Sequence, residues 1–69
     1  MSEPCALIRN YEARLKAGED PNDFVPLDPP LWMTVEQLEE WLMWSIVHVT
    51  DGREEVYRRM LYESWSENV

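Results

Sequence analysis

The chain has 69 residues, a formal net charge of −8 and a single cysteine. A chain this short forms one small domain, whose core is marginal unless a metal, a disulfide or self-association adds stability. Cys5 alone excludes an intrachain disulfide, and one Cys with one His, His48, is too small a ligand set for a structural metal site. Self-association remains, so we expect a homodimer without a cofactor.

No apolar stretch approaches the roughly 18 residues that cross a bilayer. The longest candidate, 41–49, is interrupted by Ser45 and His48. The N-terminal residues also lack the basic and apolar regions of a signal peptide. We therefore expect no membrane insertion and a cytoplasmic location.

The first predicted element is a helix over 2–18. Ser2 is a favoured residue type at a helix start, and Gly18 suits a helix end. One narrow apolar stripe recurs at three- and four-residue spacing, and it consists of Leu7, Ile8, Tyr11 and Leu15. This helix is therefore predicted to pack through one surface only.

An extended connector is predicted over 19–33. Prolines stand at positions 21, 26, 29 and 30, and proline disfavours both the helix interior and a helical conformation at the preceding residue. Phe24, Val25 and Leu27 interrupt the acidity of this segment. We expect them to hold the connector against the helices.

The second predicted helix spans 34–50. Thr34 and Gln37 match a capping box, and Met33 can pack onto Leu38 in the first turns. A core-facing stripe follows at ideal helical spacing, made of Leu38, Trp41, Leu42, Ser45, Ile46 and Val49.

From Trp41 onward this helix is apolar nearly all round, and a helix apolar on all faces is buried on all faces. A monomer of this size cannot cover both sides, so a second subunit or a partner should cover one of them. We assign the dimer interface to the residues Leu38, Trp41, Leu42, Ile46 and Val49.

The third predicted helix spans 52–66 and completes an αα-hairpin. Asp51 and Glu54 repeat the capping pattern at its start. Its predicted core stripe is Val56, Tyr57, Met60 and Leu61, with Tyr62 and Trp65 at the flank. The predicted fold is thus all-α, with an N-terminal helix, a connector and a hairpin.

Catalytic patterns are lacking. His48 is the only histidine, and its apolar neighbours are typical of a core or interface position. The paired carboxylates Glu39 with Glu40, and Glu54 with Glu55, are adjacent in sequence and so diverge by about 100° on a helix. Two glycines are too few for a phosphate-binding loop. We expect a protein that binds and does not catalyse.

The negative charge is concentrated in the middle of the chain. No Lys or Arg occurs between Lys16 and Arg53, a window that holds Glu19, Asp20, Asp23, Asp28, Glu36, Glu39, Glu40 and Asp51. Such a surface repels nucleic acid and attracts basic protein surfaces, although acidity can also serve solubility alone. We assign partner binding to Glu36, Glu39, Glu40, Met43, Trp44, Val47, Tyr62 and Trp65.

Two other functions stay open. An extended segment before two helices is the outline of a ribbon-helix-helix regulator, but Pro26, Asp28, Pro29 and Pro30 disfavour the ribbon. An acidic DNA mimic that inhibits a nuclease or a CRISPR complex has similar physical properties.

The run from Met33 to Val49, followed by 51–62, resembles the small quorum-sensing anti-activators of Pseudomonas phages. The resemblance implies a homodimer that binds the DNA-binding domain of a LuxR-type transcription activator in the bacterial host. It also implies a second target, the ATPase that assembles type IV pili, whose inhibition provides superinfection exclusion. It transfers no site residue, because it contains no diagnostic motif.

Overall fold

Helices form all the regular secondary structure of residues 6–67, which are the residues that the computed structural model describes. They are α1 (Ala6–Lys16), α2 (Pro21–Phe24), α3 (Val35–His48) and α4 (Glu54–Glu67). The prediction of an all-α fold is confirmed. Residues 2–5, where the first helix was predicted to start, lie outside the described range.

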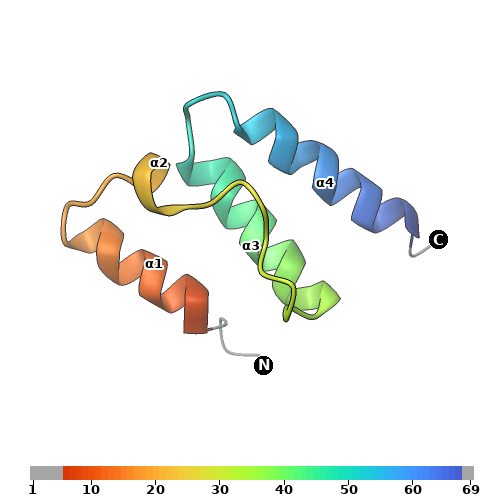
Figure 1. Ribbon diagram of the computed structural model, residues 1–69, viewed down its shortest axis with the longest axis horizontal. Helices are drawn as coiled ribbons and strands as arrows, with labels where there is room; N and C mark the ends of the chain where they lie inside the picture. Colours follow the sequence, from red (N-terminus) through yellow and green to blue (C-terminus); the bar gives the residue numbers. More distant parts are fainter. Residues whose placement is uncertain (1–5, 68–69) are drawn as a thin grey trace.

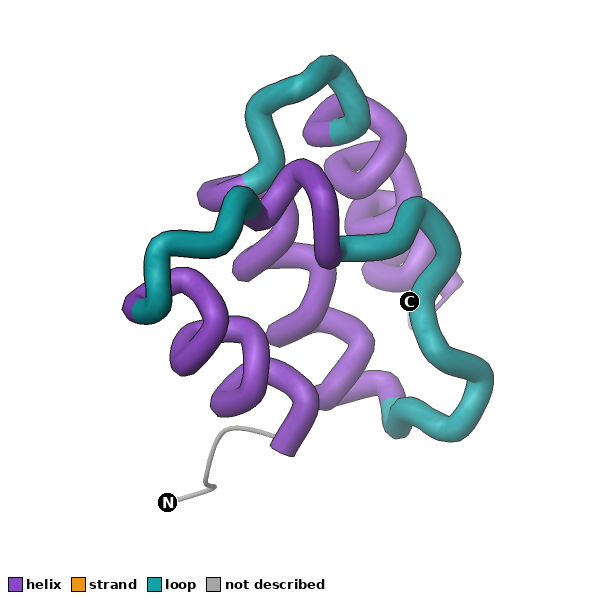
Figure 2. The backbone as a smooth tube through the Cα atoms, turned by 60° about the vertical axis from the view of Figure 1, so that its left-hand side comes forward, coloured by secondary structure: helices purple, strands orange, loops and turns teal. Residues whose placement is uncertain are grey.

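The helix α3 lies between α1 on one side and α4 on the other (Figure 1). After α2 the chain passes along α3 as a loop before it turns back into the first turn of that helix (Figure 2). The molecule measures 39 × 31 × 19 Å.

The connector contains a helical turn, so the prediction of an extended segment over 19–33 is wrong at α2. Pro21 occupies the start of this turn, where its missing N–H costs no hydrogen bond. The carboxylate of Asp20 caps the turn by accepting a 3.0 Å hydrogen bond from the N–H of Asn22. Val25, which follows the turn, is buried, as the connector's apolar residues predicted.

The predicted start of α3 is confirmed. The N–H of Gln37 donates to Thr34 Oγ1 at 3.2 Å, and the N–H of Thr34 donates to Gln37 Oε1 at 3.0 Å. These two bonds satisfy donors that the first turn of a helix leaves without partners. The register of the α3 stripe is thereby fixed.

The core forms where α1, α3 and α4 meet. Trp41 is fully buried and packs edge-on against Tyr57 of α4, with ring centroids 5.3 Å apart. Its indole N–H donates to the hydroxyl of Tyr11 on α1 at 3.3 Å. Ser45, the one buried polar residue of the range 6–66, donates to the carbonyl of Trp41 at 2.7 Å. Trp41 therefore connects all three long helices.

The start of α4 differs from the predicted one. The helix begins at Glu54, and Asp51 accepts a hydrogen bond from the N–H of Arg53 instead of capping the helix. Gly52 lies in the turn before α4 and adopts a φ of +106°, a backbone conformation that favours glycine. The helix begins two residues later than predicted. Within α4, Tyr57 is buried as predicted, but Val56 is 43% exposed.

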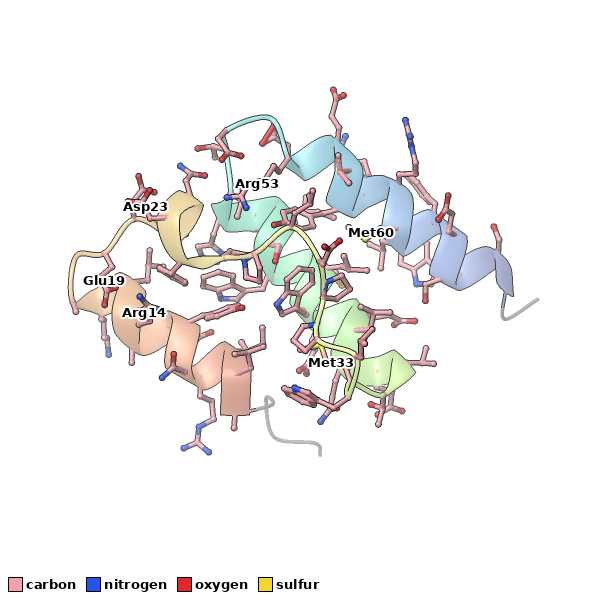
Figure 3. All side chains as sticks on the ribbon, in the orientation of Figure 1. Arg14, Glu19, Asp23, Met33, Arg53 and Met60 are labelled. Atoms are coloured by element: carbon pink, nitrogen blue, oxygen red, sulfur yellow. The ribbon has the colours of Figure 1, made fainter. Side chains whose placement is uncertain are left out.

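Arg53 fastens the connector to the loop between α3 and α4 (Figure 3). Its guanidinium donates to the carbonyl of Val25 at 2.6 Å and to that of Asn22 at 2.7 Å. Its Nε donates to the carboxylate of Asp51 at 3.1 Å. The hydroxyl of Tyr57 donates to the carbonyl of Pro26. These hydrogen bonds provide donors for the carbonyl groups of Asn22, Val25 and Pro26, which accept none from a helix.

Replacing Tyr11 with phenylalanine removes the hydroxyl that accepts the hydrogen bond of the buried Trp41 N–H. A buried donor without a partner costs about 1–3 kcal/mol, so we expect Tyr11→Phe to lower the free energy of unfolding by that amount. Urea denaturation followed by circular dichroism measures it. The control is Tyr62→Phe, at a position 59% exposed, which should change stability by less than about 0.5 kcal/mol. Equal effects of the two variants would contradict the buried hydrogen bond.

The hydrogen bond from Arg53 holds the pKa of Asp51 below its ordinary value of 3.8. A carboxylate whose pKa is lower in the folded state stabilises the fold above its unfolded pKa, and this contribution is lost as the pH falls through the folded pKa. We therefore expect Asp51→Asn to be less stable than the natural protein at pH 7, with the difference shrinking below about pH 4. Denaturant unfolding at several pH values measures this, with Asp28→Asn as the control. A difference that stays constant down to the lowest pH would refute it.

Candidate functional site

Three of the residues predicted to form a dimer interface lie inside the single chain. Trp41, Leu42 and Val49 have 0% exposure. Leu38 and Ile46 are half-buried against the same core. The stripe is covered by α1, α4 and the connector of its own chain, so a second subunit cannot contact Trp41, Leu42 or Val49 in this conformation. Their assignment to a dimer interface is therefore wrong.

Trp44 also differs from its predicted role in partner binding, because it is only 9% exposed. Its ring packs against Tyr11 and Phe24, with centroid distances of 5.3 and 6.2 Å. His48 stacks on it from the next turn, at 4.0 Å and an interplanar angle of 21°. Trp44 thus belongs to the contact of α3 with α1 and the connector.

One line of residues along α3 is left uncovered by the rest of the described chain. Met43 is 56% exposed and Val47 is 70% exposed. Glu36 and Glu40 continue the same line towards the start of the helix, because residues three and four apart share a face. We call these four residues the α3 ridge. It is acidic in its first half and apolar in its second.

On the α4 side of the ridge lies an apolar groove of about 260 Å³. We call it the α3/α4 groove. Tyr62 and Trp65 of α4 form its outer wall and pack together in a T-shape, with centroids 5.8 Å apart. Arg58 is the only charged residue among those that line it, which are Met43, Ile46, Val47, Arg58, Leu61, Tyr62 and Trp65. The structure thus brings four predicted partner-binding residues together: Met43, Val47, Tyr62 and Trp65.

On the other side of the ridge lies a second groove of about 370 Å³, between α1 and α3. We call it the α1/α3 groove. Its lining residues are Ile8, Glu12, Glu40, Met43, Trp44, Val47 and His48. Ile8 and Glu12 were not among the predicted site residues, because only the packing of α1 beside α3 reveals that they face it.

The acidic window of the sequence does not fold into one continuous surface. Glu36, Glu39 and Glu40 occupy the first turns of α3, whereas Asp51 follows its C-terminal end. The N–H of Thr50 donates to the side chain of Asn22 at 2.9 Å, which places the adjacent acids of α2 at that end too. Since α3 has 14 residues and is about 21 Å long, the acids form two separate groups.

Ion pairs neutralise two of the acids outside the first turns of α3. Glu19 binds Arg14 at 2.7 Å, and Asp51 binds Arg53 at 3.1 Å. The hydrogen bond from Arg14 lowers the pKa of Glu19, so this carboxylate stays ionised at neutral pH. Glu36 and Glu40 lie on the α3 ridge itself, in the turns before Met43 and Val47.

No metal-binding cluster forms within residues 6–67. No three His, Cys, Asp or Glu side chains of this range converge as metal ligands would. His48 Nδ1 lies 2.9 Å from the backbone carbonyl oxygen of Trp44. A carbonyl oxygen can only accept, so Nδ1 is the hydrogen-bond donor of this pair. Cys5 lies outside the described residues.

Comparison with known protein families, curated proteins and solved structures found no match to this chain. None of the four helices in the described range combines the length and hydropathy of a bilayer-spanning segment.

Proposed function

We propose that this protein works by binding other proteins and obstructing their surfaces, and not by catalysis. The observation that carries the proposal is the exposure of Met43, Val47, Tyr62 and Trp65 around one groove. Methionine and aromatic residues are enriched in protein interfaces, and contiguous apolar patches on small proteins often mark interaction sites.

For the target, we propose the DNA-binding domain of a LuxR-type quorum-sensing activator in the cytoplasm of a bacterial host. The resemblance to phage anti-activators supports this identity, and the net charge of −8 favours a basic, DNA-reading partner. The same resemblance supports a second proposed target, the ATPase of type IV pilus assembly. Its inhibition would exclude superinfecting phages.

The two alternative functions have less support. Residues 24–33 occupy the ribbon's place in a ribbon-helix-helix outline, but Phe24 ends α2 and the residues after it form a loop. The hydroxyl of Tyr57 donates to the carbonyl of Pro26 in this loop. A DNA mimic needs acids spaced along one surface, whereas the acids here gather at the two ends of α3.

We also propose a homodimer, with the second copy seated on the α3/α4 groove. Met43, Tyr62 and Trp65 offer the exposed apolar area that the core residues of α3 do not. This location replaces the interface that the sequence predicted.

Replacing Val47 with lysine places a charge on the exposed apolar ridge. The last turn of a helix tolerates a cation well, so the fold should be retained. We expect Val47→Lys to weaken binding to the LuxR-type DNA-binding domain by at least about tenfold, as loss of a central contact does. Displacement of the domain from fluorescent promoter DNA measures this.

The matched control is Val56→Lys, which adds the same charge at an apolar position 43% exposed on α4 and outside both grooves. It should leave binding within about twofold of the natural protein. If both variants bind equally well, the ridge is not the binding surface. If the natural protein displaces no DNA, the proposed target is wrong.

The dimer proposal is tested by sedimentation of the natural protein and of Trp65→Ala at micromolar concentration. Trp65 is 44% exposed and lines the groove, so its truncation should shift the equilibrium towards monomer by at least about tenfold. Trp32→Ala removes an indole that is 62% exposed elsewhere and should have no such effect. A natural protein that sediments as a monomer throughout would exclude the dimer.

A further inference from the structure

We infer that the α1/α3 groove takes a basic amphipathic helix, supplied by a segment of the partner protein. This inference rests on the proposed function and specifies the chemistry of the segment that is bound. The segment carries apolar residues at three- and four-residue spacing on one face, with Lys or Arg beside them.

The floor of the groove fits the apolar face of such a helix. Ile8 of α1 and Met43, Trp44 and Val47 of α3 line it. Along α3 the lining extends from Glu40 to His48, which is two turns or about 12 Å. A helix that lies in a groove is held by residues spaced at i, i+3, i+4 and i+7, which span the same length.

The rim of the groove determines the charge of the segment. Glu12 contributes a carboxylate from α1, Glu40 contributes one from α3, and Glu36 lies one turn before Glu40 on the ridge. Among the described residues that line this groove there is no Lys or Arg. Acids beside an apolar floor favour cations beside an apolar stripe.

The α3/α4 groove provides an internal comparison. It shares Met43 and Val47 with the α1/α3 groove, but its only charged lining residue is Arg58. A cationic helix would therefore meet no carboxylate in the lining there, whereas Glu12 and Glu40 line the groove on the other side of the same ridge. The charges thus assign the basic segment to the α1 side.

The geometry also distinguishes a helix from other occupants. Residues 6–67 contain no strand, so they offer no sheet edge to which an extended peptide could add. An anionic membrane surface attracts basic segments and would be repelled by the acids of this rim.

The probe for the test is an 18-residue peptide of leucine and lysine, with leucine at i, i+3, i+4 and i+7. Titration of the ¹⁵N-labelled full chain should shift the amide signals of Glu12 and Val47 and the indole signal of Trp44. Binding should weaken as salt is added. A peptide with glutamate in place of lysine should not bind. Failure of the lysine peptide to bind would overturn the inference.

Two matched variants separate the groove from general charge attraction. Glu12→Gln and Glu63→Gln each remove one negative charge, but only Glu12 lines the α1/α3 groove. We expect Glu12→Gln to weaken peptide binding by about threefold and Glu63→Gln to leave it nearly unchanged. Equal weakening would show that the net charge alone attracts the peptide and would overturn the inference.

A second pair tests the apolar floor. Val47→Ser alters the ridge, whereas Val56→Ser alters an exposed valine outside both grooves. Only the first should reduce binding, and circular dichroism should show unchanged helicity for both. Equal reductions would count against the groove.

Failure of this inference can be told apart from failure of the proposed function. If the LuxR-type domain binds but the peptide shifts Tyr62 and Trp65, the inference fails and the proposed function stands. If the peptide binds in the α1/α3 groove but the domain does not bind, the proposed target fails and the inference stands.

Discussion

The guanidinium of Arg53 is the contact on which the arrangement of the chain depends. The carbonyl groups of Asn22 and Val25 in the connector have no helical hydrogen-bond partner, and the guanidinium of Arg53 donates to both. The carboxylate of Asp51 accepts a hydrogen bond from Arg53 Nε and so fixes the orientation of the guanidinium. Hydrogen bonds to a charged donor are about twice as strong as neutral ones. The connector is thereby held against α3, and Val25 enters the core. Without this contact the fully buried Trp41 would lose part of its cover.

The position of the connector helps to explain why one face of α3 is exposed. A central helix in a 69-residue chain can be covered by α1 on one side, α4 on the other and the connector on a third. No chain remains in the described range to cover the fourth, where Met43 and Val47 are exposed. Met43 and Val47 are thus outside the core of the described residues. The proposed binding of another polypeptide would give these two side chains a physical role.

Much of the fold could be predicted because its signals are local. The capping box of Thr34 and Gln37 fixed the start of α3, and the three- and four-residue spacing identified the stripe through Trp41. The stripe could not reveal what covers it, so residues of the monomer core were predicted to form a dimer interface. Arg53 had no local signal at all, since its partners Asn22 and Val25 lie about thirty residues earlier in the chain. Glu12 was missed for the same reason. Its place in the lining of the α1/α3 groove depends on how α1 packs beside α3.

Met43 and Val47 line both grooves, which restricts how two partners can bind one chain. A subunit contact centred on the ridge would fill the space that a basic helix needs on the α1 side. A dimer that also captures a partner must therefore centre its contact on Tyr62 and Trp65 and leave the acidic rim open. If the contact moved onto the ridge, each copy would compete with the partner, and the apparent affinity for the partner would fall as the protein concentration rises. If both proposals hold, the shared ridge couples self-association to partner binding through two side chains.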